Sequence, residues 1–151
     1  MNARILKKLC KRAAPLIRIL DPNREVFAVG ENDYIPSWVD GCMERKSRSR
    51  FRGKVYGDYF EPLIGTMAIG YMSRGEEPEW SDEPCWDALR DHILDNFMVL
   101  VGDPDKDLDA CSWRLTLKDA SIGNIFRIAE RLCDDIASGE KRGPTRYDLT
   151  H

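Results

Sequence analysis

Hydrophobic residues in this chain come in short, periodic groups. The longest uninterrupted apolar run extends from Phe97 to Val101, far short of the roughly 20 residues that a membrane-spanning helix requires. Each element must therefore bury one apolar face against another element, which favours a layered domain. At 151 residues, a compact fold buries roughly 68–70% of its unfolded surface without disulfides or metal. The N-terminus lacks the apolar stretch of a signal peptide, so we expect a cytoplasmic protein.

The first segment predicts a basic amphipathic helix over residues 3–13. Apolar residues recur there at helical spacing, and the remaining surface is basic, with Arg4, Lys7, Lys8, Lys11 and Arg12. Pro15 removes a backbone donor and disfavours helical geometry at Ala14, so the helix is expected to end or kink near Ala13. The apolar stripe is narrow and lacks an aromatic anchor, which favours packing on the domain's own core. Binding to a membrane surface or to nucleic acid is the alternative.

The next part of the chain indicates strands. Residues 25–29 alternate enough for a short strand that ends at Gly30. A short helix is expected near residues 37–43, followed by an exposed loop. Residues 54–72 combine aromatic and aliphatic residues with glycines that disfavour a helix. Two strands with a turn near Glu61–Pro62 are therefore expected to form a central hairpin.

The clearest helix signal covers residues 84–101. Ser81 is the expected cap, and acids follow it in the first turn, where the helix dipole favours negative charge. The outer face carries three acids four residues apart, Asp87, Asp91 and Asp95. Like charges at this spacing cost about 0.2–0.5 kcal/mol per pair in an isolated helix. A positively charged partner would relieve that repulsion.

The C-terminal part predicts one more strand and one more helix. Residues 111–117 alternate as a half-buried strand does. Thr116 with Asp119 resembles a capping box that opens a helix over residues 118–138, and Gly139 ends this helix.

Together these elements predict an α+β fold, in which a small antiparallel sheet is packed by about three helices. The expected sheet combines strands from residues 25–29, 54–72 and 111–117. We expect a single domain over residues 1–139 and a polar C-terminal tail over residues 140–151.

The cysteine pattern argues against disulfides and metal. The five cysteines are Cys10, Cys42, Cys85, Cys111 and Cys133. An odd number with no close pair fits neither a disulfide framework nor a zinc ribbon, so we expect reduced, mostly buried thiols. Cys42 is the alternative, since Arg45, Lys46 and Arg48 lie nearby and positive charge lowers a thiol pKa.

Catalytic signals are weak. A serine or cysteine nucleophile normally needs a base, and the chain has two histidines, His92 in a predicted helix and His151 at its last position. Dinucleotide, phosphate-loop, zinc-protease and nucleophile-elbow motifs do not occur. We therefore expect a protein that is not an enzyme and that carries no cofactor.

The segment from Asp103 to Asp109 alternates acids as a calcium loop does. Leu108 occupies the glycine position of such a loop, and Arg114 occupies the position of the bidentate glutamate. A solvated acidic loop is the favoured interpretation, and calcium binding is the alternative.

Charge is divided unevenly along the chain. Residues 1–54 carry 13 Lys/Arg and 6 Asp/Glu, whereas residues 55–151 carry 10 and 20. Such asymmetry bears on partners more than on fold. It also makes homodimerisation plausible, and the two regions of one chain could equally attract each other.

The strongest local case for nucleic-acid binding is an Arg-rich segment with one aromatic residue. Its members are Arg45, Lys46, Arg48, Arg50, Phe51, Arg52 and Lys54. Several cations release counterions from phosphates, and an aromatic ring can stack on a base.

Two stretches, MNARILKKLCKRAAPLI at residues 1–17 and GTMAIGYMSRGEEPEWSDEPCWDALRDHI at residues 65–93, resemble an uncharacterised group of small accessory proteins from bacteriophages and prophages of Pseudomonas-type hosts. The resemblance covers under a third of the chain. It implies a protein that acts inside an infected bacterium by binding a host protein or ribonucleoprotein, including CRISPR-type defence complexes.

The function expected from these observations is stoichiometric, non-catalytic binding of a host macromolecule through an acidic surface that covers a basic one. The residues expected to form this surface are Glu76, Glu77, Glu79, Asp82, Asp87, Asp91 and Asp95. A nucleic-acid-binding accessory protein that uses residues 45–54 is the alternative.

Overall fold

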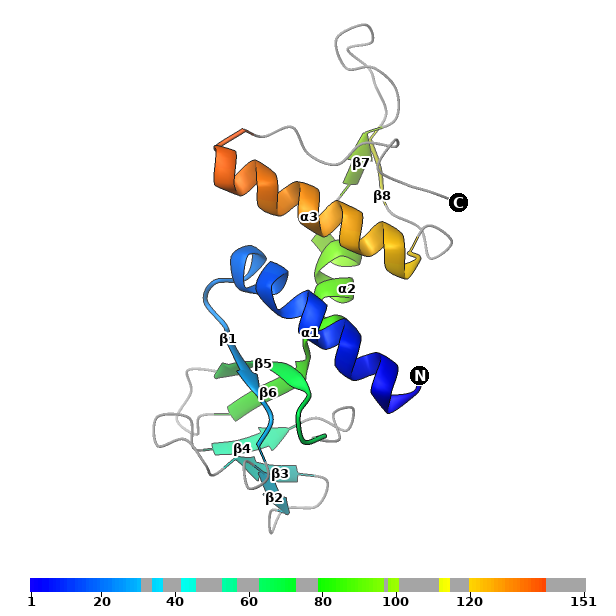
Figure 1. The fold of residues 1–151 in the computed structure, drawn as a ribbon. Coiled ribbons are helices and arrows are strands. Elements are labelled where there is room, and N and C mark those ends of the chain that lie inside the picture. Colours follow the sequence, from blue (N-terminus) through cyan, green and yellow to red (C-terminus); the bar gives the residue numbers. More distant parts are fainter. Residues whose placement is uncertain are drawn as a thin grey trace, which may run out of the picture. The chain divides into compact units, whose positions relative to one another are not determined.

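The computed structural model describes residues 1–30, 34–36, 42–45, 53–56, 63–72, 79–96, 98–100, 112–114 and 120–140 (Figure 1). The helices in these ranges are α1 (Ala3–Leu20), α2 (Cys85–Asn96) and α3 (Ile122–Ser138). The strands are β1 (Glu25–Ala28), β2 (Tyr34–Pro36), β3 (Cys42–Arg45), β4 (Gly53–Tyr56), β5 (Met67–Met72), β6 (Glu79–Pro84), β7 (Met98–Leu100) and β8 (Ser112–Arg114). None of these three helices is long and apolar enough to cross a membrane.

The predicted α+β class is confirmed. Six strands form one sheet in the order β1-β5-β6-β4-β3-β2, and β7 pairs with β8 in a second sheet. Neighbouring strands run antiparallel, apart from β4 and β6, which run parallel. The described part of the chain thus forms a mainly antiparallel sheet, a two-stranded sheet and three helices.

The chain divides into two compact units, Met1–Ala88 and Leu89–His151. The first unit contains α1 and the six-stranded sheet, and the second contains β7, β8 and α3. The division falls within α2. A single domain over residues 1–139 stays a prediction, and residues 141–151 of the predicted tail lie outside the described residues.

Helix α1 continues beyond the end that its sequence predicts. Ala13, Ala14 and Ile17 are buried on both sides of Pro15, whereas Pro15 itself is exposed. The expected end near Ala13 is wrong because the apolar stripe carries the helix past the proline. The missing N–H of Pro15 lies on the solvent-facing side, where water can bond to the carbonyl of Lys11.

Strand β1 forms where the sequence predicts it and extends into a short connection with β5. The backbone N–H of Val29 donates to the carbonyl of Thr66 at 2.9 Å, and the N–H of Gly65 donates to the carbonyl of Val29 at 2.8 Å. Gly65 has a φ of 84°, a conformation that side-chain-bearing residues rarely adopt. Phe27, Val29 and Ala68 then form a buried cluster.

The expected hairpin between β4 and β5 is wrong, although both strands form. Strand β5 pairs with β1 and β6, while β4 pairs with β3 and β6. Alternating apolar residues indicate that a segment is extended, but they do not identify its neighbour. The expected turn near Glu61–Pro62 lies outside the described residues.

The short helix predicted near residues 37–43 is also wrong at its C-terminal end, because β3 begins at Cys42. This strand pairs with β2 on one side and with β4 on the other. Pairing on both sides outweighs the weak local preference that suggested a helix. Residues 37–41 lie outside the described residues.

Strand β6 occupies the segment that was expected to open the second helix. Residues 81–83 pair with β5, so the expected cap at Ser81 and the acidic first turn are wrong. A proline disfavours helical geometry at the residue before it, and Pro84 therefore keeps Glu83 extended. The Glu83 carboxylate accepts a hydrogen bond from Nη1 of Arg24 at 2.9 Å, an ion pair that reaches from the start of β1.

The second helix is also shorter than expected at its C-terminal end. Helix α2 stops at Asn96, and β7 follows where the sequence predicts helix to residue 101. Val99 of β7 is paired with Trp113 of β8. The predicted strand over residues 111–117 is extended at 112–114, but it belongs to this second sheet and not to the main one.

Helix α3 begins with a single capping side chain. Oγ of Ser121 accepts the backbone N–H of Asn124 at 3.2 Å, so the expected start at residue 118 is wrong. Ser121 caps the helix directly because its backbone is extended and its hydroxyl reaches the third helical amide. The predicted end is confirmed, since Gly139 takes a left-handed φ of 74°.

Candidate functional site

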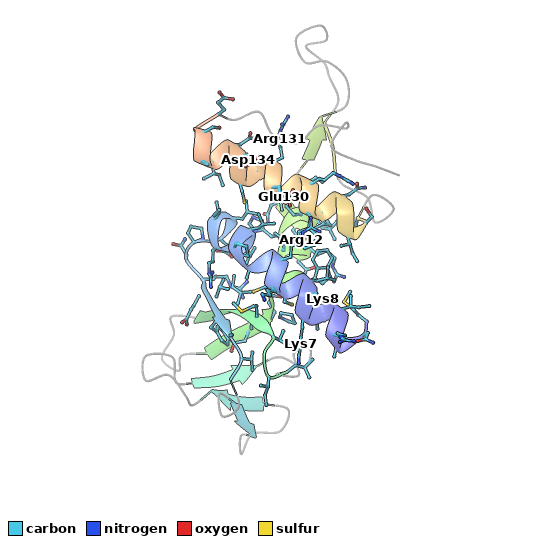
Figure 2. The ribbon with its side chains drawn as sticks, in the orientation of Figure 1. Lys7, Lys8, Arg12, Glu130, Arg131 and Asp134 are labelled. Atoms are coloured by element: carbon cyan, nitrogen blue, oxygen red, sulfur yellow. The ribbon has the colours of Figure 1, made fainter. Side chains whose placement is uncertain are left out.

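Helix α1 presents an exposed surface that is basic along its whole length. Its Lys and Arg residues are all exposed, and no acidic residue occurs within the helix. These residues are Arg4, Lys7, Lys8, Lys11, Arg12 and Arg18. We call them the α1 basic face. Lys7, Lys8 and Arg12 are labelled along α1 in Figure 2.

The α1 basic face forms two rows. Arg4, Lys8 and Arg12 follow one another at intervals of four residues, and Lys7 is followed by Lys11 in the same way. Arg18 continues the second row beyond Pro15. At about 100° per residue, the six cations cover about 140° of the helix circumference, and the rows run about 21 Å along the axis.

The buried side of α1 fixes which residues point outward. Cys10, Ala13, Ala14 and Ile17 are at most 3% exposed, and they occupy the arc opposite the basic face. The helix is capped at its start, where Oδ1 of Asn2 accepts the backbone N–H of Arg4 at 2.8 Å. The cations are therefore held on a positioned helix.

The arrangement is unfavourable for an isolated helix. Like charges at spacings of three or four cost about 0.2–0.5 kcal/mol per pair. Cations near an N-terminus also oppose the helix dipole, and the first turn of α1 contains no acid. Within the described ranges, Lys7, Lys8 and Lys11 form no ion pair that would offset this repulsion. The repulsion decreases when an anionic partner binds.

The predicted acidic surface is only partly brought together. Asp82 is 6% exposed and lies in β6, so its inclusion in a contact surface is wrong. It is buried because it takes part in the sheet, where the sequence predicts an exposed helix start. Asp91 and Asp95 are exposed on α2, Asp87 is half-buried, and Asp91 lies 3.7 Å from Nε of Arg90.

The other acids of that surface receive no further support. Glu79 is the first residue of β6. Glu76 and Glu77 lie outside the described residues.

The Arg-rich segment is described at its ends alone. Arg45 ends β3, so the expected loop is wrong at that position, whereas Lys54 lies in β4, within the region where strands are predicted. The register places Lys54 opposite Glu44 and Arg45 opposite Gly53. Lys46, Arg48, Arg50, Phe51 and Arg52 lie outside the described residues.

Three cysteines are free and buried, as the sequence predicts. They are Cys10, Cys85 and Cys133. The backbone N–H of Trp86 donates to Sγ of Cys10 at 3.5 Å. Burial raises the pKa of Cys85 to about 12 and that of Cys133 to about 11, and it raises the pKa of Cys10 as well. These thiols stay protonated at neutral pH, so they are poor nucleophiles.

The other residues that the sequence suggests for catalysis or metal binding are the remaining cysteines, the acidic segment and His92. Cys42 is in β3, while Cys111 and the acidic segment from Asp103 to Asp109 are outside the described residues. In the part of the chain that the structure describes, no group of three His, Cys, Asp or Glu residues could hold a metal ion. His92 is half-buried in α2, where its carbonyl accepts Nδ2 of Asn96 at 3.1 Å.

Helix α3 of the second unit differs from α1 in its surface chemistry. Its exposed and half-buried charges include both signs, as Glu130, Arg131 and Asp134 show in Figure 2. Arg127 is also exposed and donates from Nη1 to Oδ1 of Asn124 at 3.0 Å. A mixed surface of this kind is ordinary for a solvated helix. The one-sided charge of α1 is therefore specific to that helix.

Sequence reasoning found five cations of this face but not its full length. Arg18 was missed because Pro15 predicted an earlier end. The burial of Ala13 and Ala14 before the proline and of Ile17 after it corresponds to an apolar spacing that was visible in the sequence. Comparison with protein-family models, curated proteins and solved structures finds no match to this chain.

Proposed function

We propose that this protein is a non-catalytic binding protein whose α1 basic face docks on the phosphates of a nucleic acid. The observation that carries the proposal is the exposure of six cations on one helix that contains no acid. Phosphate contacts by Lys and Arg release condensed counterions, and this release supplies most of the affinity of sequence-independent binding.

Nucleic acid is a better partner for this helix than a lipid surface. An interfacial helix places its apolar face in the bilayer, but the apolar face of α1 is buried in the protein. Around the helix, the exposed Ile5 lies just beyond Arg12, and the exposed Ile19 and Pro15 lie among the cations. The exposed surface of α1 is therefore mainly cationic and has no continuous apolar stripe.

The test is fluorescence anisotropy of the full chain with a labelled 20-base-pair DNA duplex, over a series of salt concentrations. With up to six phosphate contacts, log K should fall with log salt with a slope of about −5. The variant K7Q/K8Q/K11Q should reduce the steepness of that slope by about 2.7. The matched control, K7R/K8R/K11R, keeps the charge and should bind as the parent does. Equal affinity of both triple variants and the parent would refute the proposal.

A second candidate function rests on Asp91 and Asp95, which are both exposed on α2. In this candidate the protein covers the basic surface of a host protein or ribonucleoprotein, as the resemblance to small phage accessory proteins implies. The variant D91N/D95N should then lose its partner in a nuclease-treated pull-down from host lysate, while K7Q/K8Q/K11Q should retain it. A partner that the parent captures from untreated lysate and loses after nuclease treatment would favour nucleic-acid binding.

A further inference from the structure

The chemistry of the α1 basic face limits which nucleic acid it can recognise. The exposed residues of α1 are the six cations together with Ala3, Ile5, Pro15 and Ile19. The helix contains no aromatic residue and no Ser, Thr, Asn or Gln. Binding to single strands relies on aromatic side chains on which bases stack, and α1 offers none.

The face is also poorly equipped to read a base sequence. Asn and Gln read adenine, carboxylates read cytosine, and Arg or Lys reads guanine. Of these groups α1 has the guanine readers alone, so it has no side chain that recognises adenine or cytosine. Long, flexible cations in a repulsive array are suited to phosphates, which position a protein without specifying sequence.

The dimensions of the face favour a duplex with two accessible phosphate rows. An α-helix with its side chains is about 10–12 Å across, and the major groove of B-form DNA is about 12 Å wide. The major groove of A-form RNA is deep and too narrow for side chains to read. The two rows of cations lie on the two sides of the exposed arc, where the two strands of a B-form groove would meet them.

On the basis of the proposed function, we infer that the ligand of α1 is double-stranded DNA, bound independently of its base sequence with the helix along the major groove. Each row then meets one strand. Arg4, Lys8 and Arg12 contact the phosphates of one strand, while Lys7, Lys11 and Arg18 contact those of the other.

The experiment compares five probes with the full chain at one salt concentration. They are two 20-base-pair DNA duplexes of unrelated sequence, a 20-nucleotide DNA single strand, a 20-base-pair RNA duplex, and vesicles of phosphatidylserine and phosphatidylcholine at 1:3. We expect the two DNA duplexes to bind within about threefold of each other, because phosphate contacts carry no sequence information. Both should bind at least about tenfold more tightly than the other probes, because only B-form duplexes present both phosphate rows to the helix.

The row variants test the placement of the helix. R4Q/K8Q/R12Q and K7Q/K11Q/R18Q each remove three cations, and each should reduce the salt slope on duplex DNA by about 2.7. Circular dichroism should show that both variants keep the helicity of the parent. An effect confined to one row would overturn groove placement.

The outcomes separate this inference from the proposed function. Tighter binding to the single strand or to duplex RNA would refute the inference and leave nucleic-acid binding in place. Discrimination of more than about tenfold between the two DNA duplexes would do the same. Binding to the vesicles without binding to any nucleic acid would refute both.

Discussion

Replacing Pro15 by alanine should stabilise the protein. Proline in a helix interior costs about 3 kcal/mol relative to alanine, because it removes a hydrogen bond and its ring crowds the carbonyl four residues earlier. Pro15 is exposed, so water offsets part of the lost bond and the stiffness of proline in the unfolded chain offsets more. We therefore expect P15A to gain about 1–3 kcal/mol in free energy of unfolding.

The assay is urea unfolding followed by circular dichroism at 222 nm, with thermal unfolding as a second measure. At about 2–4 °C per kcal/mol for a protein of this size, Tm should rise by about 2–12 °C. The control K11A changes an exposed helix former to another one and keeps the carbonyl that faces Pro15, so it should change stability by less than about 0.5 kcal/mol. Destabilisation by P15A, or no change, would mean that Ala13, Ala14 and Ile17 depend on the backbone geometry that proline imposes.

Three further predictions concern the cores and a cap. Phe126 is fully buried, so F126A should cost about 3–5 kcal/mol in urea unfolding, and a loss below 1 kcal/mol would contradict its place in the core. Ser121 caps α3, so S121A should lose about 0.5–2 kcal/mol in free energy of unfolding, while S121D should stay close to the parent. Equal losses of stability in both variants would exclude capping. Burial raises the pKa of Cys85 to about 12 from 9.0, and the unfolded chain therefore ionises first. Cys85 should contribute stability below pH 9 that is lost as pH rises toward 12. C85S should flatten this alkaline decline in unfolding experiments, and an unchanged slope would refute the assignment.

The local sequence pattern correctly predicted those elements that depend on neighbouring residues in the chain. The alternation at Glu25–Ala28 and the glycine after α3 lie where the sequence predicts them. Helix ends were less predictable because each depends on a balance between local chemistry and burial. Pro15 does not end α1 because the apolar stripe continues, whereas Pro84 does delay α2 because Glu83 is already paired in a sheet. Proline thus leaves α1 uninterrupted at Pro15 but delays the start of α2 at Pro84.

The order of the strands and the composition of the acidic surface were harder to predict because both depend on contacts between residues distant in sequence. Which strand lies beside β4 depends on residues distant in sequence, and β6 is inserted between β4 and β5. Once β6 is a strand, Asp82 becomes a buried residue and not a member of an acidic surface. The basic face of α1, by contrast, follows from helical spacing as far as Arg12, and Arg18 joins it because the helix continues past Pro15.

The strand order has a consequence for how the protein is made. The last two strands of the main sheet in the chain, β5 and β6, lie side by side within it, with β1 next to β5 and β4 next to β6. Strand β1 gains its neighbour in this sheet when β5 is synthesised, whereas β4 pairs with the earlier β3 and gains its second neighbour when β6 follows. Strands β5 and β6 are antiparallel neighbours close in sequence, so they can form a local hairpin onto which the earlier strands add. During translation, β1 and one edge of β4 therefore stay without these partners until β5 and β6 follow, and a pause in synthesis before β5 would lengthen the exposure of those edges to mispairing and aggregation.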